Sequence, residues 1–125
     1  VRAGLSAYRQ LEHDRSIHYD RVKTNRTLVM RPSEVLQLKR RAMRDAVGRF
    51  RTSNLRVFGS ALHGTDREGS DLDLLVDPLP GATLLDLGGL QDDLESLLGI
   101  PVDLLTPADL PAQFRAQVLS EAQPV

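Results

Sequence analysis

The sequence predicts an α/β domain in which helices alternate with short strands. Three segments carry apolar residues at helical spacing, namely 33–50, 83–99 and 111–122. Short runs rich in Leu and Val lie among them, at 55–58, 70–76 and 101–105. A chain of 125 residues with 41% apolar residues is also long enough to form one hydrophobic core.

Cap residues and apolar spacing define the helices. The first helix is expected to begin at Ser33, a residue that can cap it. Its predicted core-facing residues are Val35, Leu38, Ala42, Ala46 and Phe50. Thr83 can cap a second helix, and Gly99 suits the left-handed conformation that ends many helices. Its apolar stripe is predicted to be Leu87, Leu90, Leu94 and Leu97. The last helix is expected to bury Phe114 and Val118.

A sharp turn follows the first predicted strand. The strand 55–58 ends directly in Gly59 and Ser60, and a short helical turn leads to Gly64. Glycine lets the backbone approach a phosphate closely, while the Ser60 hydroxyl and nearby amides can donate hydrogen bonds to phosphate oxygens. The turn is therefore a candidate anion-binding site. The next strand is expected to end at Pro78.

Composition restricts the class of protein. Residues 1–29 are polar and basic with a poor apolar pattern, so we interpret them as an N-terminal extension and expect the domain proper to span residues 30–125. The absence of Cys excludes thiol catalysis, Cys-ligated zinc and disulfides. No apolar run approaches the roughly 20 residues that a membrane span needs, and the first residues do not show the charged-then-apolar pattern expected of a signal peptide. We expect a cytoplasmic protein.

Charge is divided unevenly along the chain. Residues 1–60 hold 14 basic and five acidic residues, whereas residues 61–125 hold two basic and 12 acidic residues. Two interpretations remain open. The halves can form solvated faces, or a basic surface for an acidic partner can stand beside an acidic pocket that concentrates cations. The basic run 39–44 has no interleaved aromatic residues, so direct nucleic-acid binding is not expected.

Two carboxylates, Asp71 and Asp73, carry the predicted chemistry. Side chains alternate along a strand, so both project from one face while Leu72 packs on the other. Asp103, between two apolar residues of the next strand, is expected on the same face. Mg²⁺ relieves the repulsion between such carboxylates because it prefers oxygen ligands. A chain with 12 Asp contains roughly one Asp-x-Asp by chance, so the prediction depends on the anion-binding turn beside it.

The motifs together resemble the minimal nucleotidyltransferases of the DNA polymerase beta superfamily. They are GSxxxG at 59–64, GSDLDLLV at 69–76 and VDLL at 102–105. The resemblance implies a small mixed β-sheet with flanking helices, and it covers the chain from about Met30 onward. His63 and Ala61 stand where many relatives carry Arg.

The resemblance also implies roles for individual residues. Gly59 and Ser60 would bind the nucleoside triphosphate. Asp71 and Asp73 would hold two Mg²⁺ ions, and Asp103 would complete the catalytic metal site and assist deprotonation of the acceptor hydroxyl. These are the expected catalytic and metal-binding residues.

The implied function is Mg²⁺-dependent transfer of AMP from ATP to a hydroxyl group. Proteins of this kind commonly act as antitoxins that adenylylate a tyrosine of a HEPN-family toxin, so such a toxin is the expected partner. Two alternatives stay open. The chain can neutralise its toxin by binding alone, or it can transfer a nucleotide to a small molecule.

The remaining polar residues are expected to serve the structure. His63 is interpreted as a solvent-facing loop residue, with phosphate contact as the alternative. Asp77 is expected in a turn beside Pro78. The basic run 39–44 is expected to form a solvated helix face, as are the acidic residues Asp92, Asp93 and Glu95.

Overall fold

The computed structural model describes residues 30–125, so the prediction of an N-terminal extension over 1–29 lies outside the described residues. Helices and strands alternate as expected. The elements in chain order are α2 (Pro32–Val47), β1 (Thr52–Phe58), α3 (Ser60–His63), β2 (Leu72–Pro78), α4 (Leu84–Leu98), β3 (Val102–Leu105), the 3₁₀ helix η1 (Pro107–Asp109), α5 (Ala112–Glu121) and β4 (Gln123–Pro124).

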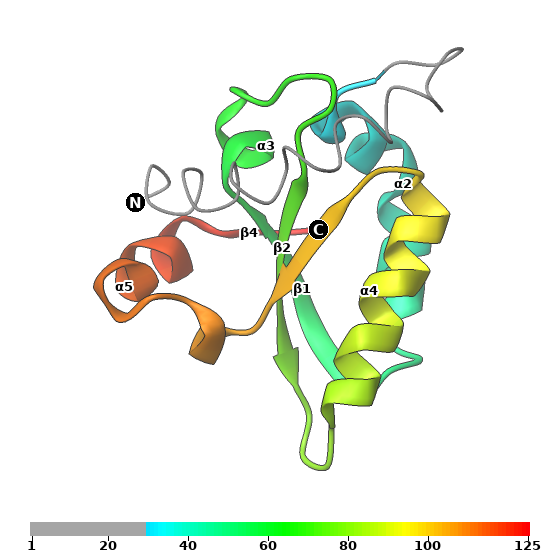
Figure 1. The fold of residues 1–125 in the computed structure, drawn as a ribbon, viewed down its shortest axis with the longest axis vertical. Coiled ribbons are helices and arrows are strands. Elements are labelled where there is room, and N and C mark those ends of the chain that lie inside the picture. Colours follow the sequence, from blue (N-terminus) through cyan, green and yellow to red (C-terminus); the bar gives the residue numbers. More distant parts are fainter. Residues whose placement is uncertain (1–29) are drawn as a thin grey trace.

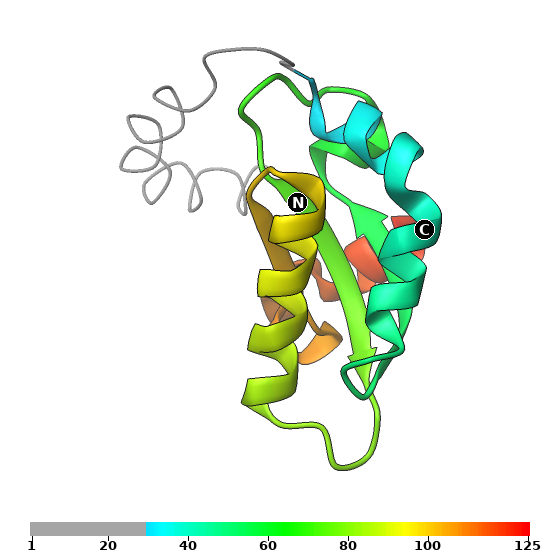
Figure 2. The same cartoon turned by 90° about the vertical axis from the view of Figure 1, so that its right-hand side faces the viewer.

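The sheet has four strands in the order β3-β2-β1-β4. Strand β1 runs antiparallel to β2 and β4, whereas β2 and β3 are parallel, so the predicted mixed sheet is confirmed. A parallel pair needs a crossover connection, and α4 provides it. Helices α2 and α4 cover one face of the sheet, while η1 and α5 lie against the other (Figures 1 and 2).

The main core lies between the sheet and the α2–α4 layer, and a smaller cluster of Phe58, Leu75, Leu110 and Val118 lies under α5. The prediction that Leu38 faces the core is wrong, because its side chain is 70% exposed. Helix α2 is rotated relative to the predicted stripe. It buries Val35, Leu36, Met43, Ala46 and Val47, which also recur at helical spacing.

Two strand boundaries differ from the prediction. Strand β2 begins at Leu72 and includes Pro78, so Asp71 precedes the strand instead of lying within it. Strand β4 was not predicted, since two residues are too short for a periodic pattern. It pairs with β1 and brings Val125 into the core, where its amide donates to the Leu55 carbonyl.

Side chains from α4 protect the outer edge of β3. The amide of Val102 donates to Glu95 at 2.9 Å, and the amide of Leu104 donates to Gln91 at 3.3 Å. Glu95 was expected on a solvated helix face, but it satisfies a strand amide that would otherwise face a neighbouring chain. Within residues 30–125, no helix combines the length and apolar character needed to cross a bilayer.

The basic run 39–44 also contributes to the fold. Arg40 and Arg44 both donate to the carbonyl of Val125, at 3.0 and 2.9 Å. Lys39, Arg41 and Arg44 are exposed as predicted, whereas Arg40 is partly buried.

The first turn of α2 is capped from a distant loop. Asp66, in the connection between α3 and β2, is only 3% exposed. Its carboxylate accepts from the amide of Ser33 at 2.8 Å and from the hydroxyl of Ser33 at 3.1 Å. Ser33 was expected to cap the helix itself, but the helix begins at Pro32 and Ser33 acts as a donor. Asp66 thereby fixes the loop that leads to Asp71.

We expect the Asp66→Ala substitution to destabilise the domain by about 1–3 kcal/mol, because it leaves the partly buried Ser33 donors of the α2 first turn without their acceptor. Glu68→Ala is the matched control, since Glu68 is an exposed acid in the same loop. Urea unfolding of the three proteins measures the difference. Equal midpoints for both variants would show that Asp66 does not hold this helix end.

Candidate functional site

The predicted carboxylates come together where β2 and β3 begin. Asp73 and Asp103 are direct register partners on these parallel strands, and Asp71 lies two residues before Asp73. All three are partly buried. Their apolar neighbours Leu72 and Val102 are buried on the α2–α4 side. The expectation that Asp73 and Asp103 share a sheet face is thus met, whereas Asp71 lies just before β2, outside the paired residues.

Gly59 lies directly against Asp73. Its neighbour Phe58 is the register partner of Asp73 on β1, so the turn begins beside the carboxylate. Gly59 adopts φ 76° and ψ −150°, a conformation found almost only in glycine. A Cβ atom added there would overlap Oδ2 of Asp73. Glycine is therefore required for both the backbone conformation and the close approach to the carboxylate.

The turn for which anion binding is predicted lies next to Asp73. Ser60 opens α3 and is partly exposed, and Gly64 ends the helix in the left-handed conformation, with φ 74°. The polar loop that follows is held by Asp66 and returns the chain to Asp71. Helix α3, which begins at Ser60, and the start of β2 therefore lie at the same end of the sheet (Figure 1).

His63, expected to be a solvent-facing residue, is exposed but paired. Its Nε2 lies 3.2 Å from Oε1 of Glu121, which connects α3 to the end of α5. Gln117 donates to the other oxygen of Glu121 at 3.0 Å. The hydrogen bond from Gln117, and then the contact with His63, lower the pKa of Glu121 below its ordinary 4.5.

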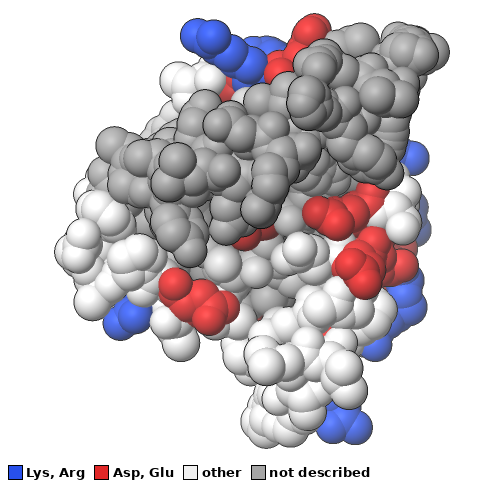
Figure 3. Space-filling view, in the orientation of Figure 1, with Lys and Arg blue, Asp and Glu red and all other residues white. Residues whose placement is uncertain are grey.

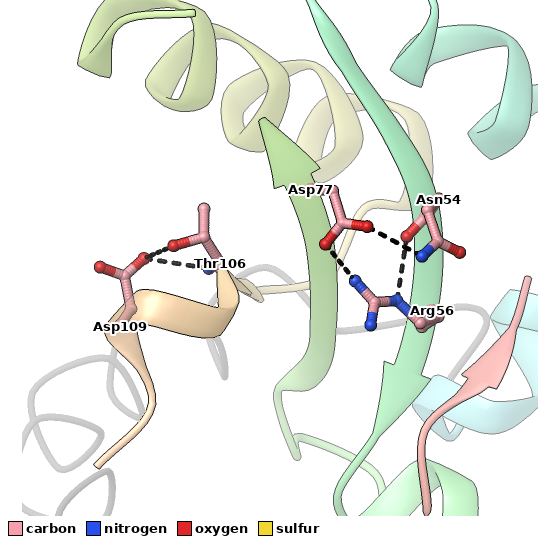
Figure 4. Close-up of polar contacts among 5 residues, drawn as sticks. All are labelled: Asn54, Arg56, Asp77, Thr106 and Asp109. Carbon is pink, nitrogen blue, oxygen red and sulfur yellow. Dashed lines mark hydrogen bonds and ion pairs between the residues drawn. The ribbon is translucent and has the colours of Figure 1, made fainter. Parts of the chain in front are cut away.

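An ion pair between Arg56 and Asp77 lies on the same sheet face, toward the other end of β2. Asp77 accepts from Arg56 at 2.6 Å and from Asn54 at 2.9 Å, and Arg56 also donates to the Asn54 carbonyl (Figure 4). The prediction that Asp77 is a turn residue is wrong, because β2 continues to Pro78. Asp77 is therefore occupied with a structural contact away from the other three carboxylates.

The segment that follows Asp103 is fixed by its own hydrogen bonds. Thr106 donates to Asp109 through both its amide and its hydroxyl, at 3.0 Å each (Figure 4). Arg115 of α5 donates to the carbonyls of Pro107 and Leu110, at 2.9 and 2.8 Å. These contacts hold η1 and α5 against the sheet, so β3 and its carboxylate have a rigid support.

The residues at this end of the sheet fit a hard divalent cation. They supply carboxylate oxygens from adjacent backbone positions, and Gly59 leaves space beside Asp73 that any other residue would fill. Within residues 30–125, no group of three or more His, Asp or Glu side chains already stands close enough to hold a metal ion. One or two carboxylates, with waters and substrate phosphates, form the usual ligand set of Mg²⁺ in such sites.

Figure 3 shows acidic groups at several separate places on this side of the molecule, with uncharged groups between them and basic groups at the edges. Among the described residues in this view, the acidic groups do not form one continuous patch.

The nucleotidyltransferase domain family matches residues 36–125 of this chain. The protein adenylyltransferase MntA of Thermococcus cleftensis is 40% identical over 73 residues, covering 58% of this chain and 74% of MntA. A solved structure assigned to the minimal nucleotidyltransferases is 44% identical, with a TM-score of 0.68 over 74% of this chain and 95% of its own. A toxin–antitoxin structure with AMP-PNP shares the fold, with a TM-score of 0.52 and 22% identity over 74% of this chain and 70% of that one.

Proposed function

Because this chain belongs to the minimal nucleotidyltransferases of the nucleotidyltransferase domain family, we propose that it transfers AMP from ATP to a tyrosine hydroxyl of a partner toxin. The observation that carries the proposal is the register pairing of Asp73 with Asp103 beside the Gly59 turn. Carboxylates and an anion-binding turn at one end of a sheet are the parts that nucleotidyl transfer needs.

In the proposed reaction, Gly59 and Ser60 position the triphosphate. The absence of a side chain at Gly59 lets phosphate oxygens approach the turn, and the Ser60 hydroxyl donates a hydrogen bond to one of them. Transfer forms a bond from the acceptor oxygen to the α-phosphorus, breaks the bond from that phosphorus to the leaving oxygen and releases pyrophosphate.

The three carboxylates perform the remaining tasks. Asp71 and Asp73 would hold two Mg²⁺ ions, with Asp103 as a further ligand of one of them. When bound, the ions neutralise charge on the phosphates and lower the pKa of the acceptor hydroxyl. Asp103 lies on β3 beside Asp73, and in this proposal it assists deprotonation of the acceptor hydroxyl.

A protein acceptor is supported by the relatives. MntA of T. cleftensis, with 40% identity, is a protein adenylyltransferase, and the structure with AMP-PNP is a toxin–antitoxin complex. We therefore take a HEPN-family toxin as the partner, ATP as the co-substrate and the cytoplasm as the location. In this proposal the chain is an antitoxin that acts by catalysis.

Intact-mass spectrometry of the toxin tests the proposal. The toxin encoded beside this protein is incubated with the protein, MgCl₂ and each nucleoside triphosphate in turn. We expect a mass increase of one or more AMP groups with ATP, none with EDTA, and a modified tyrosine in the peptide fragments. A stable complex without any adduct would favour neutralisation by binding alone. Transfer only to small molecules would overturn the protein acceptor.

A further inference from the structure

The connection between β2 and α4 exposes large apolar side chains. Leu79, Leu84 and Leu85 are 44%, 84% and 87% exposed. They belong to residues 79–85, a segment without a charged residue, which we call the apolar lobe. The lobe projects at the bottom of Figures 1 and 3. A contiguous exposed apolar segment of this kind usually marks an interaction surface.

The fold does not require leucine at these positions. The buried stripe of α4 consists of Leu90, Leu94 and Leu98, deeper in the helix. The N-terminus of α4 is capped by polar groups instead, since Leu85 donates its amide to Thr83 and Thr83 donates its amide to Asp86. Polar side chains at Leu84 and Leu85 would serve the helix equally well, so the exposed leucines need another explanation.

A cation is fixed at the rim of the apolar lobe. The guanidinium of Arg51 donates to the Gly81 carbonyl at 3.4 Å, and the Arg51 carbonyl accepts from the Leu79 amide at 2.9 Å. Arg51 is exposed and makes no ion pair with another of the residues that the structure describes. The lobe therefore suits a partner surface that combines apolar side chains with carboxylates.

A second copy of this chain fits the lobe poorly. In a two-fold contact the lobe of one copy meets the lobe of the other. Residues 79–85 hold no acidic residue, so such a contact would offer Arg51 no carboxylate from the facing lobe. Three leucines also provide far less area than the roughly 800 Å² per partner of a stable interface, so the occupant must reach other surfaces as well.

The lobe lies at the opposite end of β2 from the carboxylates. Asp73 is near the start of the strand and Leu79 follows its last residue. At about 3.3 Å per residue, the two positions are roughly 20 Å apart. A small acceptor molecule does not reach from one to the other, whereas a folded protein does.

We propose that the apolar lobe is the docking anchor for the protein substrate, which places apolar side chains on Leu84 and Leu85 and carboxylates near Arg51. This inference rests on the proposed function, because it takes the toxin as the acceptor. It adds that recognition and chemistry occupy opposite ends of β2. Substrate choice is then decided at a surface that takes no part in the reaction.

The test uses the double variant Leu84→Glu, Leu85→Glu in the full chain with the toxin as probe. Acidic residues in the first turn of a helix are favourable, so the variant is expected to fold like wild type. Leu38→Glu is the matched control, because Leu38 is an equally accessible leucine on α2, 70% exposed. Binding affinity, AMP transfer to the toxin and binding of Mg²⁺–ATP are measured for each protein.

We expect the double variant to lose at least about tenfold in affinity for the toxin, as truncation of a buried apolar anchor does. Transfer at sub-saturating toxin falls in proportion, while Mg²⁺–ATP binding and the Leu38→Glu control stay at wild-type values. Wild-type affinity in the double variant would overturn the inference. So would a wild-type dimer that the double substitution dissociates while toxin binding is retained, because the occupant would then be a second copy.

Failure of the proposed function is recognised separately. If wild type binds the toxin without modifying it and the double variant does not bind, the docking surface stands and the catalytic proposal fails.

The charge at the rim of the apolar lobe is tested with Arg51→Gln. We expect a severalfold slower association at low salt that disappears at high salt. An association rate equal to that of wild type at both salt concentrations would overturn the carboxylate-bearing partner.

Discussion

The Asp73→Asn variant is expected to bind the toxin normally but to lose AMP transfer. The substitution keeps the shape of the side chain and removes the negative charge that would hold both Mg²⁺ ions. A bound cation contributes several kcal/mol to such a reaction, so we expect a loss of at least about a thousandfold in the transfer rate. Single-turnover formation of the AMP adduct measures this rate.

Asp92→Asn is the matched control for this prediction. Asp92 is an exposed acid on α4, outside the group at the start of β2 and β3. We expect its transfer rate to equal that of wild type. A transfer rate for Asp73→Asn within about tenfold of wild type would contradict the assignment of Asp73 as a metal ligand, since loss of a ligand of both ions should reduce the rate far more.

The Gly59→Ala variant is expected to lose both stability and activity. Alanine at φ 76° and ψ −150° adopts a conformation that costs about 1–3 kcal/mol, and its Cβ overlaps Oδ2 of Asp73. The carboxylate must then move from its position beside Asp103. We expect a lower melting temperature and a transfer rate reduced at least about tenfold, because small displacements of reacting groups have large effects.

The Gly64→Ala variant distinguishes the effect of the backbone conformation from the effect of the clash with Asp73. Gly64 also has a positive φ, 74°, but a Cβ there has no atom within 4 Å. We expect a loss of stability of about 1 kcal/mol from the left-handed conformation, with transfer close to wild type. Equal losses of activity in both variants would show that the backbone conformation, and not contact with Asp73, explains the requirement for glycine.

Local motifs allowed much of the candidate site to be predicted. Side-chain alternation placed Asp73 and Asp103 on one sheet face, because each stands between apolar residues that must face the core. The Gly59 turn was evident from a strand that ends directly in Gly-Ser. What alternation cannot provide is register, and the direct pairing of Asp73 with Asp103 became visible only in the sheet.

Contacts between distant segments could not be predicted in the same way. Asp66 caps α2 across 33 residues, and Glu121 holds His63 across 58 residues. No local pattern marks either acid, since both could equally have been solvated. The exposure of Leu38 was missed for a related reason. Two overlapping apolar stripes fit α2, and only its packing on α4 and the sheet selects one of them.

The central claim is that the carboxylates at the start of β2 and β3 transfer AMP to the partner protein. The most direct measurement is the intact mass of the toxin recovered from its complex with wild type or with Asp71→Asn, Asp73→Asn, after incubation with ATP and MgCl₂. The account predicts an AMP adduct from the wild-type complex and unmodified toxin from an equally stable variant complex. Unmodified, neutralised toxin in both complexes would contradict it and identify a protein that acts by binding alone.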